Sequence, residues 1–271
     1  MQPDDSRTPE QIRVPVTGGE LAALYWGADA PAAPLVVLLH GLTADATDWA
    51  PVAAALAGDC EVVVPDLRGR AASAELPGPY GLSAHAADVT ALLEHFGADG
   101  GSGADVTVLV GHSMGAFVAA LATAGQARHL VHGLVLVDGG LPLAVPPAAD
   151  LADALAAVFG TSPDDVTGTS PQGRRAVPEA VQVDGGDLLA NEAVLEATTG
   201  FPVPTTLLWA PRGPQGAEPG LYDQVRLAGM GLPADEVTVR EVPGTDHWSI
   251  LRSADGVAAI SGAVRDAAAR D

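Results

Sequence analysis

The sequence contains no lysine, only one cysteine and no long apolar run. All thirteen basic residues are arginine, against 34 acidic ones, and the net charge of −21 argues against nucleic acid or an anionic membrane surface as a partner. With Cys60 alone, an intrachain disulfide and a multi-cysteine metal site are excluded. No stretch approaches the roughly 18 apolar residues of a membrane span. The first residues lack the basic start and apolar run of a signal peptide, so a cytoplasmic location is expected.

What is present indicates one globular domain of the α/β class. Of 271 residues, 48% are hydrophobic and 17% charged, which suits a chain that buries one substantial core. Short apolar runs alternate with longer helical patterns, as in parallel strands joined by crossover helices. The sequence therefore predicts a mostly parallel, eight-stranded sheet flanked by helices. The predicted strands are residues 12–16, 21–26, 35–39, 61–64, 106–110, 134–137, 205–209 and 237–242.

Two features of the organisation lie between these strands. A crossover helix is predicted to start with Ser83 as its N-cap and to end at Gly97. Residues 139–204 break the alternation with an Ala-rich helical piece and a Pro/Gly/Ser-rich stretch, and they are too many for a plain connection. We expect them to form a helical cap or lid inserted into a core domain of residues 1–138 and 205–271.

A Gly-His-Ser-Met-Gly motif at residues 111–115 stands between an apolar strand and an amphipathic helix. A Ser at such a sharp strand-to-helix turn adopts a strained backbone conformation, and the glycines on either side allow neighbouring segments to approach. This is the context of a nucleophile elbow, so Ser113 is the predicted nucleophile. His247 follows the last predicted strand in a short loop before the final helix, and it is the predicted general base.

With these elements, and with an Asp-Leu-Arg-Gly turn at residues 66–69, the chain resembles the α/β-hydrolase superfamily from about Ile12 to the final helix. The resemblance implies the α/β-hydrolase fold and hydrolysis of an ester, thioester, amide or lactone without a cofactor or metal. It also implies an oxyanion hole made by the backbone N–H groups of Leu42, after the His40-Gly41 pair, and of Met114. The His40 side chain itself is expected to fix the loop by a hydrogen bond.

The catalytic acid departs from the pattern of that superfamily, which places an Asp shortly after the strand before the final crossover. Here that segment offers only Glu218 and, further on, Asp223, both reached through a Gly/Pro-rich loop. Asp138 instead follows the strand after the nucleophile helix directly, a placement similar to that in certain haloalkane dehalogenases. We favour Asp138 as the acid, with Glu218 as the alternative.

Several other functions compete with ester hydrolysis. A cofactor-free haloperoxidase or a carbon–carbon bond hydrolase of this superfamily can carry a similar Ser, His and Asp set, and a catalytically silent binding protein can retain the pocket. A Ser at position 113 counts against dehalogenases and epoxide hydrolases, which need a carboxylate nucleophile. His129 and His132 lack a third ligand for a metal. The composition of residues 139–204 favours a small-molecule substrate with an apolar acyl group.

Overall fold

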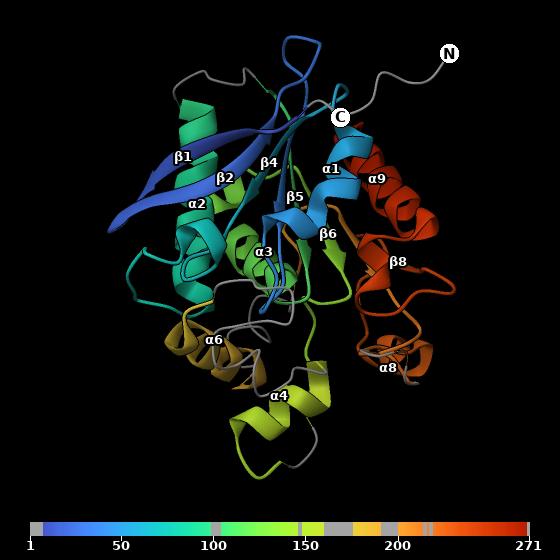
Figure 1. The fold of residues 1–271 in the computed structure, drawn as a ribbon. Coiled ribbons are helices and arrows are strands. Elements are labelled where there is room, and N and C mark those ends of the chain that lie inside the picture. Colours follow the sequence, from blue (N-terminus) through green and yellow to red (C-terminus); the bar gives the residue numbers. More distant parts are fainter. Residues whose placement is uncertain are drawn as a thin grey trace.

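The computed structural model describes residues 8–98, 104–145, 148–159, 176–190, 200–213, 216 and 219–269. Its strands form one sheet (Figure 1). The strands are β1 (Glu10–Val16), β2 (Gly19–Trp26), β3 (Leu35–Leu39), β4 (Glu61–Pro65), β5 (Thr107–His112), β6 (Gly133–Val137), β7 (Thr205–Trp209) and β8 (Val237–Glu241).

The strand order is β1-β2-β4-β3-β5-β6-β7-β8. The hairpin of β1 and β2 is antiparallel and joins β4 in antiparallel pairing, and every later pair is parallel. The predicted mostly parallel, eight-stranded sheet is confirmed. The three central strands β3, β5 and β6 are buried along their whole length, because helices cover both faces of a parallel sheet.

Helices form a layer on each side of the sheet. The α-helices are α1 (Ala50–Leu56), α2 (Leu82–Ala98), α3 (Met114–Ala124), α4 (Leu151–Phe159), α6 (Pro178–Ala190), α8 (Gln224–Gly229) and α9 (Ala254–Ala268). Helices α2 and α3 share a core cluster with Val37 and Leu39, whereas α1 and α9 share the other with Val36 and Leu38. Alternate residues of β3 thus point to opposite layers, as the two-residue period of a strand requires.

Parallel pairing brings the carboxyl ends of β5, β6 and β7 to one edge of the sheet. His112 is in register with Val137, and Val137 with Leu208. The residues that follow these strands, including Ser113 and Asp138, therefore lie beside one another. Such an edge is where open α/β sheets place their ligands.

We call residues 139–204 the β6–β7 segment, of which α4 and α6 lie together at one end of the molecule (Figure 1). The two helices are packed closely, because a Cβ on Gly185 would lie 2.8 Å from Leu155 Cδ1. The segment also corrects one prediction. Helix α2 begins at Leu82, so Ser83 is not its N-cap; instead the carboxylate of Asp187 in α6 accepts a hydrogen bond from the Leu82 amide at 3.0 Å.

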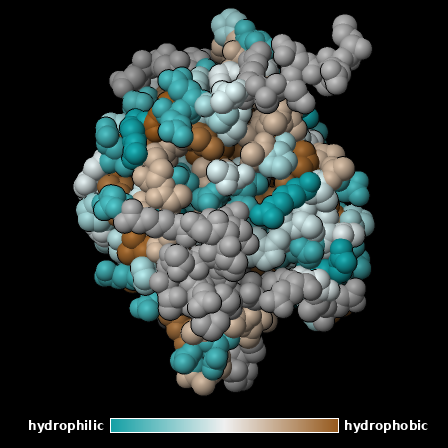
Figure 2. All heavy atoms as spheres, viewed as in Figure 1, coloured by the Kyte–Doolittle hydropathy of each residue, from teal (hydrophilic) through white to brown (hydrophobic). Residues whose placement is uncertain are grey.

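On the face drawn in Figure 2, hydrophilic and hydrophobic residues are interspersed among the residues that carry colour. Among the described ranges, none of the helices has the length and apolar character needed to cross a bilayer.

Helix α2, the longest of the described helices, is amphipathic: Val89, Leu92 and Leu93 belong to the core, whereas Glu94 is exposed.

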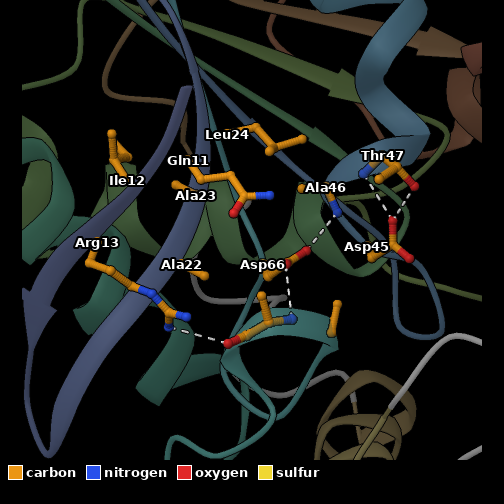
Figure 3. Close-up of a pocket in the computed structure, with 12 residues that line it drawn as sticks. Gln11, Ile12, Arg13, Ala22, Ala23, Leu24, Asp45, Ala46, Thr47 and Asp66 are labelled. Carbon is orange, nitrogen blue, oxygen red and sulfur yellow. Dashed lines mark hydrogen bonds between the residues drawn. The ribbon is translucent and has the colours of Figure 1, made fainter. Parts of the chain in front are cut away.

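A pocket of about 350 Å³ lies between the β1–β2 hairpin and the turns that follow β3 and β4 (Figure 3). In it, the Asp66 carboxylate accepts hydrogen bonds from the amides of Ala46 at 2.8 Å and Ala72 at 3.1 Å. Asp66 thereby ties the two turns together. The described residues that line the pocket do not include Ser113 or His247, so it is separate from the serine turn.

Candidate active site

Ser113 stands between β5 and α3 with a backbone φ of +53°, a left-handed conformation that side chains rarely adopt. Its amide donates to the Val137 carbonyl at 3.1 Å. The turn is closed so tightly that a Cβ on Gly111 would collide with the Gly115 backbone and one on Gly115 with the Leu39 carbonyl. The two glycines of the motif are therefore required by packing.

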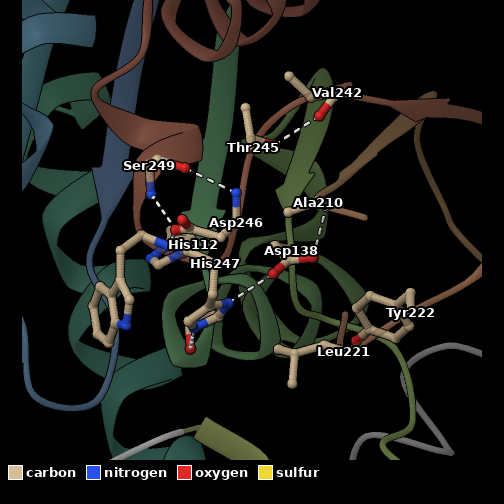
Figure 4. A network of polar contacts seen from close by, with 12 residues as sticks. His112, Asp138, Ala210, Leu221, Tyr222, Val242, Thr245, Asp246, His247 and Ser249 are labelled. Carbon is tan, nitrogen blue, oxygen red and sulfur yellow. Dashed lines mark hydrogen bonds and ion pairs between the residues drawn. The ribbon is translucent and has the colours of Figure 1, made fainter. Parts of the chain in front are cut away.

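Three side chains form a continuous hydrogen-bonded chain at this turn. Ser113 Oγ lies 3.0 Å from His247 Nε2, and His247 Nδ1 lies 2.7 Å from Asp138 Oδ2. Asp138 Oδ1 accepts a further bond from the Ala210 amide at 3.1 Å (Figure 4). Because an ionised carboxylate only accepts, Nδ1 of His247 carries the proton and Nε2 is free to accept that of Ser113. All three side chains are buried.

The loop that carries His247 is held from two sides. Asp246 Oδ1 accepts from the amides of Trp248 at 3.0 Å and Ser249 at 2.8 Å, which fixes the turn on either side of the histidine. His112 Nε2 donates to the His247 carbonyl at 2.7 Å. Burial holds the pKa of His112 well below its usual value, and nearby His247 lowers it further, so this ring is neutral.

The loop after Asp138 is also fixed. The Tyr222 hydroxyl donates to the Leu141 carbonyl at 2.8 Å and accepts from the Leu141 amide at 3.2 Å. Burial raises the pKa of Tyr222, which keeps the phenol protonated and able to donate. Asp138 itself has a φ of +44°. A Cβ on the next residue, Gly139, would lie 2.5 Å from the Ser113 carbonyl oxygen, so this loop lies directly against the serine turn.

The remaining candidates have other places. The Asp223 carboxylate accepts from the Arg226 amide at 2.8 Å and caps α8, so it is engaged in a helix terminus. Glu218 lies outside the described residues. His132 Nδ1 accepts from the Thr107 amide at 3.1 Å, a hydrogen bond that joins β5 to the start of β6. The structure thus brings Asp138, and not Asp223, to His247.

The loop after β3 lies against the serine turn. A Cβ on Gly41 would be 3.2 Å from Ser113 Cβ and 3.6 Å from Ser113 Oγ. Among the described residues, none accepts a hydrogen bond from the Leu42 amide. Met114 is the first residue of α3, where an amide has no acceptor within its own helix. His40 Nε2 accepts from the Leu67 amide at 2.9 Å, so its Nδ1 carries the proton and donates to the Gly41 carbonyl at 2.8 Å. The predicted loop-fixing role of His40 is confirmed.

Sequence reasoning did not find the groups that support these residues. The Ala210 amide is a backbone group, and a sequence carries no signal for it. Tyr222 lies far along the chain from Leu141 and forms no motif with it. Arg70, whose Nε donates to the Leu42 carbonyl at 3.1 Å, follows the Asp-Leu-Arg-Gly turn and could have been noticed there.

Such an arrangement has a defined chemical capacity. A serine whose hydroxyl contacts a histidine, itself oriented by a buried carboxylate, can attack an electrophilic carbonyl or phosphonyl centre. Backbone N–H groups beside that serine can stabilise the oxyanion that forms. The described residues supply the serine, the carboxylate and the histidine from the loops after β5, β6 and β8. The N–H groups come from the loop after β3 and the start of α3.

Solved structures with a similar fold include a thioesterase domain from the curacin biosynthetic pathway, with a TM-score of 0.67 and 20% identity. That match covers 96% of this chain and all of the other. An E-2-(acetamidomethylene)succinate hydrolase matches with a TM-score of 0.69 and 20% identity, over 95% of this chain and all of the other. An esterase from Thermogutta terrifontis matches with a TM-score of 0.65 and 22% identity, over 96% and 97%. These likenesses establish the fold.

Curated relatives match a smaller part of the chain. An uncharacterized protein of Mycobacterium tuberculosis is 36% identical over 107 residues, which are 40% of this chain. The match spans only 29% of that relative, less than a third of its length. The sequence profile described as the alpha/beta hydrolase family, in contrast, matches residues 36–260, from β3 to α9. This protein therefore belongs to the alpha/beta hydrolase family.

Proposed function

We propose that the protein is a serine hydrolase that cleaves a carboxylic ester, or a related thioester, lactone or amide, through an acyl-enzyme on Ser113. The observation that carries the proposal is the buried hydrogen-bonded chain from Ser113 through His247 to Asp138. The named esterase and thioesterase among the structures of similar fold are compatible with it.

The mechanism follows from the positions of the protons. His247 Nε2 takes the Ser113 proton as Oγ attacks the substrate carbonyl, and the Leu42 and Met114 amides stabilise the resulting oxyanion. His247 then gives its proton to the leaving group, and water hydrolyses the acyl-enzyme with the same histidine as base. Asp138 keeps the proton of His247 on Nδ1 throughout and stabilises the imidazolium that forms.

We also propose that the β6–β7 segment acts as a cap over this site and favours an apolar acyl group. In support, α4 and α6 belong to this segment and lie at one end of the molecule (Figure 1). The segment follows Asp138 directly, so its first residues start beside the proposed acid.

The test is hydrolysis of p-nitrophenyl esters of increasing acyl length, with Ser113→Ala as the inactive variant. Ser253→Ala is the matched control, because it removes a serine hydroxyl that caps α9 outside the site. We expect Ser113→Ala to abolish both ester hydrolysis and labelling by a fluorophosphonate, while Ser253→Ala keeps both. A wild type that neither hydrolyses any ester nor reacts with the fluorophosphonate would refute the proposal and favour a silent binding protein.

A further inference from the structure

The Leu42 amide, a proposed oxyanion donor, is oriented by the two peptide groups on either side of the Leu42 Cα. The first contains the Leu42 N–H together with the Gly41 carbonyl, and His40 Nδ1 donates to that carbonyl at 2.8 Å. The second contains the Leu42 carbonyl, and Arg70 Nε donates to it at 3.1 Å. Because a peptide group is planar, the first bond fixes the direction of the Leu42 N–H directly. The second bond holds the following peptide group and so restrains the backbone rotation at Leu42 that would turn the N–H away.

Both donors are themselves held by the turn after β4. His40 depends on the Leu67 amide for its tautomer. Burial lowers the pKa of His40 despite the opposing charge of Asp66, so its Nε2 remains an acceptor. Arg70 is 1% exposed, and its Nη1 donates to the Arg68 carbonyl at 3.0 Å. The turn after β4 therefore holds in place both donors to the loop after β3.

Arg70 also connects the turn after β4 to the β6–β7 segment. Its Nη2 forms an ion pair of 2.6 Å with Asp184 in α6, and both side chains are buried. His85 Nε2 donates to the same carboxylate at 2.9 Å, and the Gly81 amide donates to it at 2.6 Å. Burial opposes ionisation of Asp184, but the bond with His85 and the charges of His85 and Arg70 lower its pKa below the usual value.

Backbone contacts reinforce the ion pair. The Val177 amide donates to the Gly69 carbonyl at 2.9 Å, and Arg70 and Ala176 form an antiparallel bridge. A Cβ on Gly69, which has a φ of +77°, would lie 2.7 Å from the Ala180 Cβ, so α6 is seated closely on the turn. The start of α6 and the turn after β4 thus form one packed unit.

We infer that Arg70 is a positioning residue for the proposed hydrolysis. Arg70 orients the Leu42 N–H toward the oxyanion, and through Asp184 this orientation depends on the docking of α6. The inference rests on the proposed function. Arg70 acts through the Leu42 peptide and touches none of the reacting atoms. The β6–β7 segment, beyond covering the site, thereby sets the geometry of the oxyanion loop.

Two variants test the inference. Arg70→Met combined with Asp184→Asn removes both charges of the pair, which avoids leaving one charge buried alone and keeps an acceptor for His85. Arg70→Lys keeps a charge opposite Asp184 but has no Nε to donate to the Leu42 carbonyl. The matched control is Arg68→Met with Asp88→Asn, because Arg68 and Asp88 form a second buried pair of 2.6 Å. That pair reaches Thr17 and Pro77 and not the oxyanion loop.

The readouts are kcat and KM for an ester, and the inhibition constant of a trifluoromethyl ketone, whose serine adduct places an oxyanion in the hole. Concentrations are corrected by fluorophosphonate titration of active sites, so a loss of folded protein does not appear as a loss of kcat. Removing one oxyanion donor outright lowers kcat about 10²- to 10³-fold. For a misaligned donor we expect kcat to fall about 10- to 100-fold and the inhibition constant to rise about as much, with KM changed less than about threefold.

The control variant should keep the wild-type kcat and inhibition constant per active site, even if it is less stable. The inference is overturned if either folded Arg70 variant retains both wild-type constants, or if the control loses them equally. A wild type without any hydrolysis or labelling would refute the proposed function instead. An active wild type with unaffected Arg70 variants would refute the positioning role alone.

Discussion

Replacing Asp138 by Asn tests how the carboxylate acts in the proposed mechanism. The Ala210 amide donates to Oδ1, so an Asn at this position keeps its oxygen there and turns its NH₂ group toward His247. His247 Nδ1 must then accept that bond, and the ring proton moves to Nε2. A protonated Nε2 cannot accept the Ser113 proton, so the histidine has the wrong tautomer for catalysis.

The expected magnitude follows from the same geometry. Loss of the correct tautomer lowers kcat about 10⁴-fold in a serine protease with this constellation. At about 1.36 kcal/mol for each factor of ten, that is about 5.4 kcal/mol of transition-state stabilisation. Because Asp138 is buried behind His247, KM should stay close to the wild-type value, and kcat and kcat/KM should fall together.

The assay compares kcat of Asp138→Asn, Glu218→Gln and Asp223→Asn on one p-nitrophenyl ester, with thermal unfolding measured alongside. Asp223 caps α8, so Asp223→Asn, which keeps a capping oxygen, is a control for a carboxylate that does not reach His247. A kcat for Asp138→Asn within about tenfold of the wild type, against the expected 10⁴-fold loss, would refute the reasoning. A selective loss in Glu218→Gln would assign the acid to Glu218.

Three further predictions concern the support of the site. Gly115→Ala should lower the free energy of unfolding by at least about 2 kcal/mol in urea titration, because its Cβ would collide with the Leu39 carbonyl. Tyr222→Phe removes the hydroxyl that pairs with Leu141 and should cost about 1–3 kcal/mol of stability, with a smaller loss of kcat than Asp138→Asn. Because the pKa of Asp184 is lower in the folded protein, its ionised carboxylate stabilises the fold at any pH above its unfolded-state pKa of about 3.9. This stabilisation is lost as the pH falls through the folded-state pKa. Asp184→Asn should therefore lose less stability than the wild type on acidification, and an equal loss in both would contradict this account.

Local patterns were sufficient to predict the fold and the positions of the serine and the histidine. The apolar runs predicted the buried parallel strands, since such strands are apolar along their length. The antiparallel pair β1 and β2 and the edge strand β8, which is mostly exposed, were also predicted. The glycines at 111 and 115 indicated a close backbone approach, and the structure shows one at each. The N-cap at Ser83 was wrong because the carboxylate that binds the start of α2 belongs to Asp187, which is distant in sequence.

The ion pair between Arg70 and Asp184 could not be predicted for a related reason. Its partners lie in the turn after β4 and in α6, and no local pattern relates the two. The residues next to an arginine in a turn do not show whether its side chain is buried or exposed. In the folded chain Arg70 is buried, and α6 packs closely on the neighbouring Gly69.

Sheet topology limits where the proposed acid can lie, but it does not choose between the ends of two neighbouring strands. A carboxylate that orients His247 must reach Nδ1, and residues at the ends of both β6 and β7 lie near enough, because these strands are neighbours. The sequence offers an Asp after β6 and an Ala-Pro pair after β7. The structure uses both strands: β6 supplies the carboxylate of Asp138, and β7 supplies the Ala210 amide that fixes its orientation. In the usual pattern of the superfamily, the end of β7 carries the acid. Here it provides a hydrogen-bond donor to Asp138, the acid that we propose, so a sequence without an Asp after β7 can still place a carboxylate on His247.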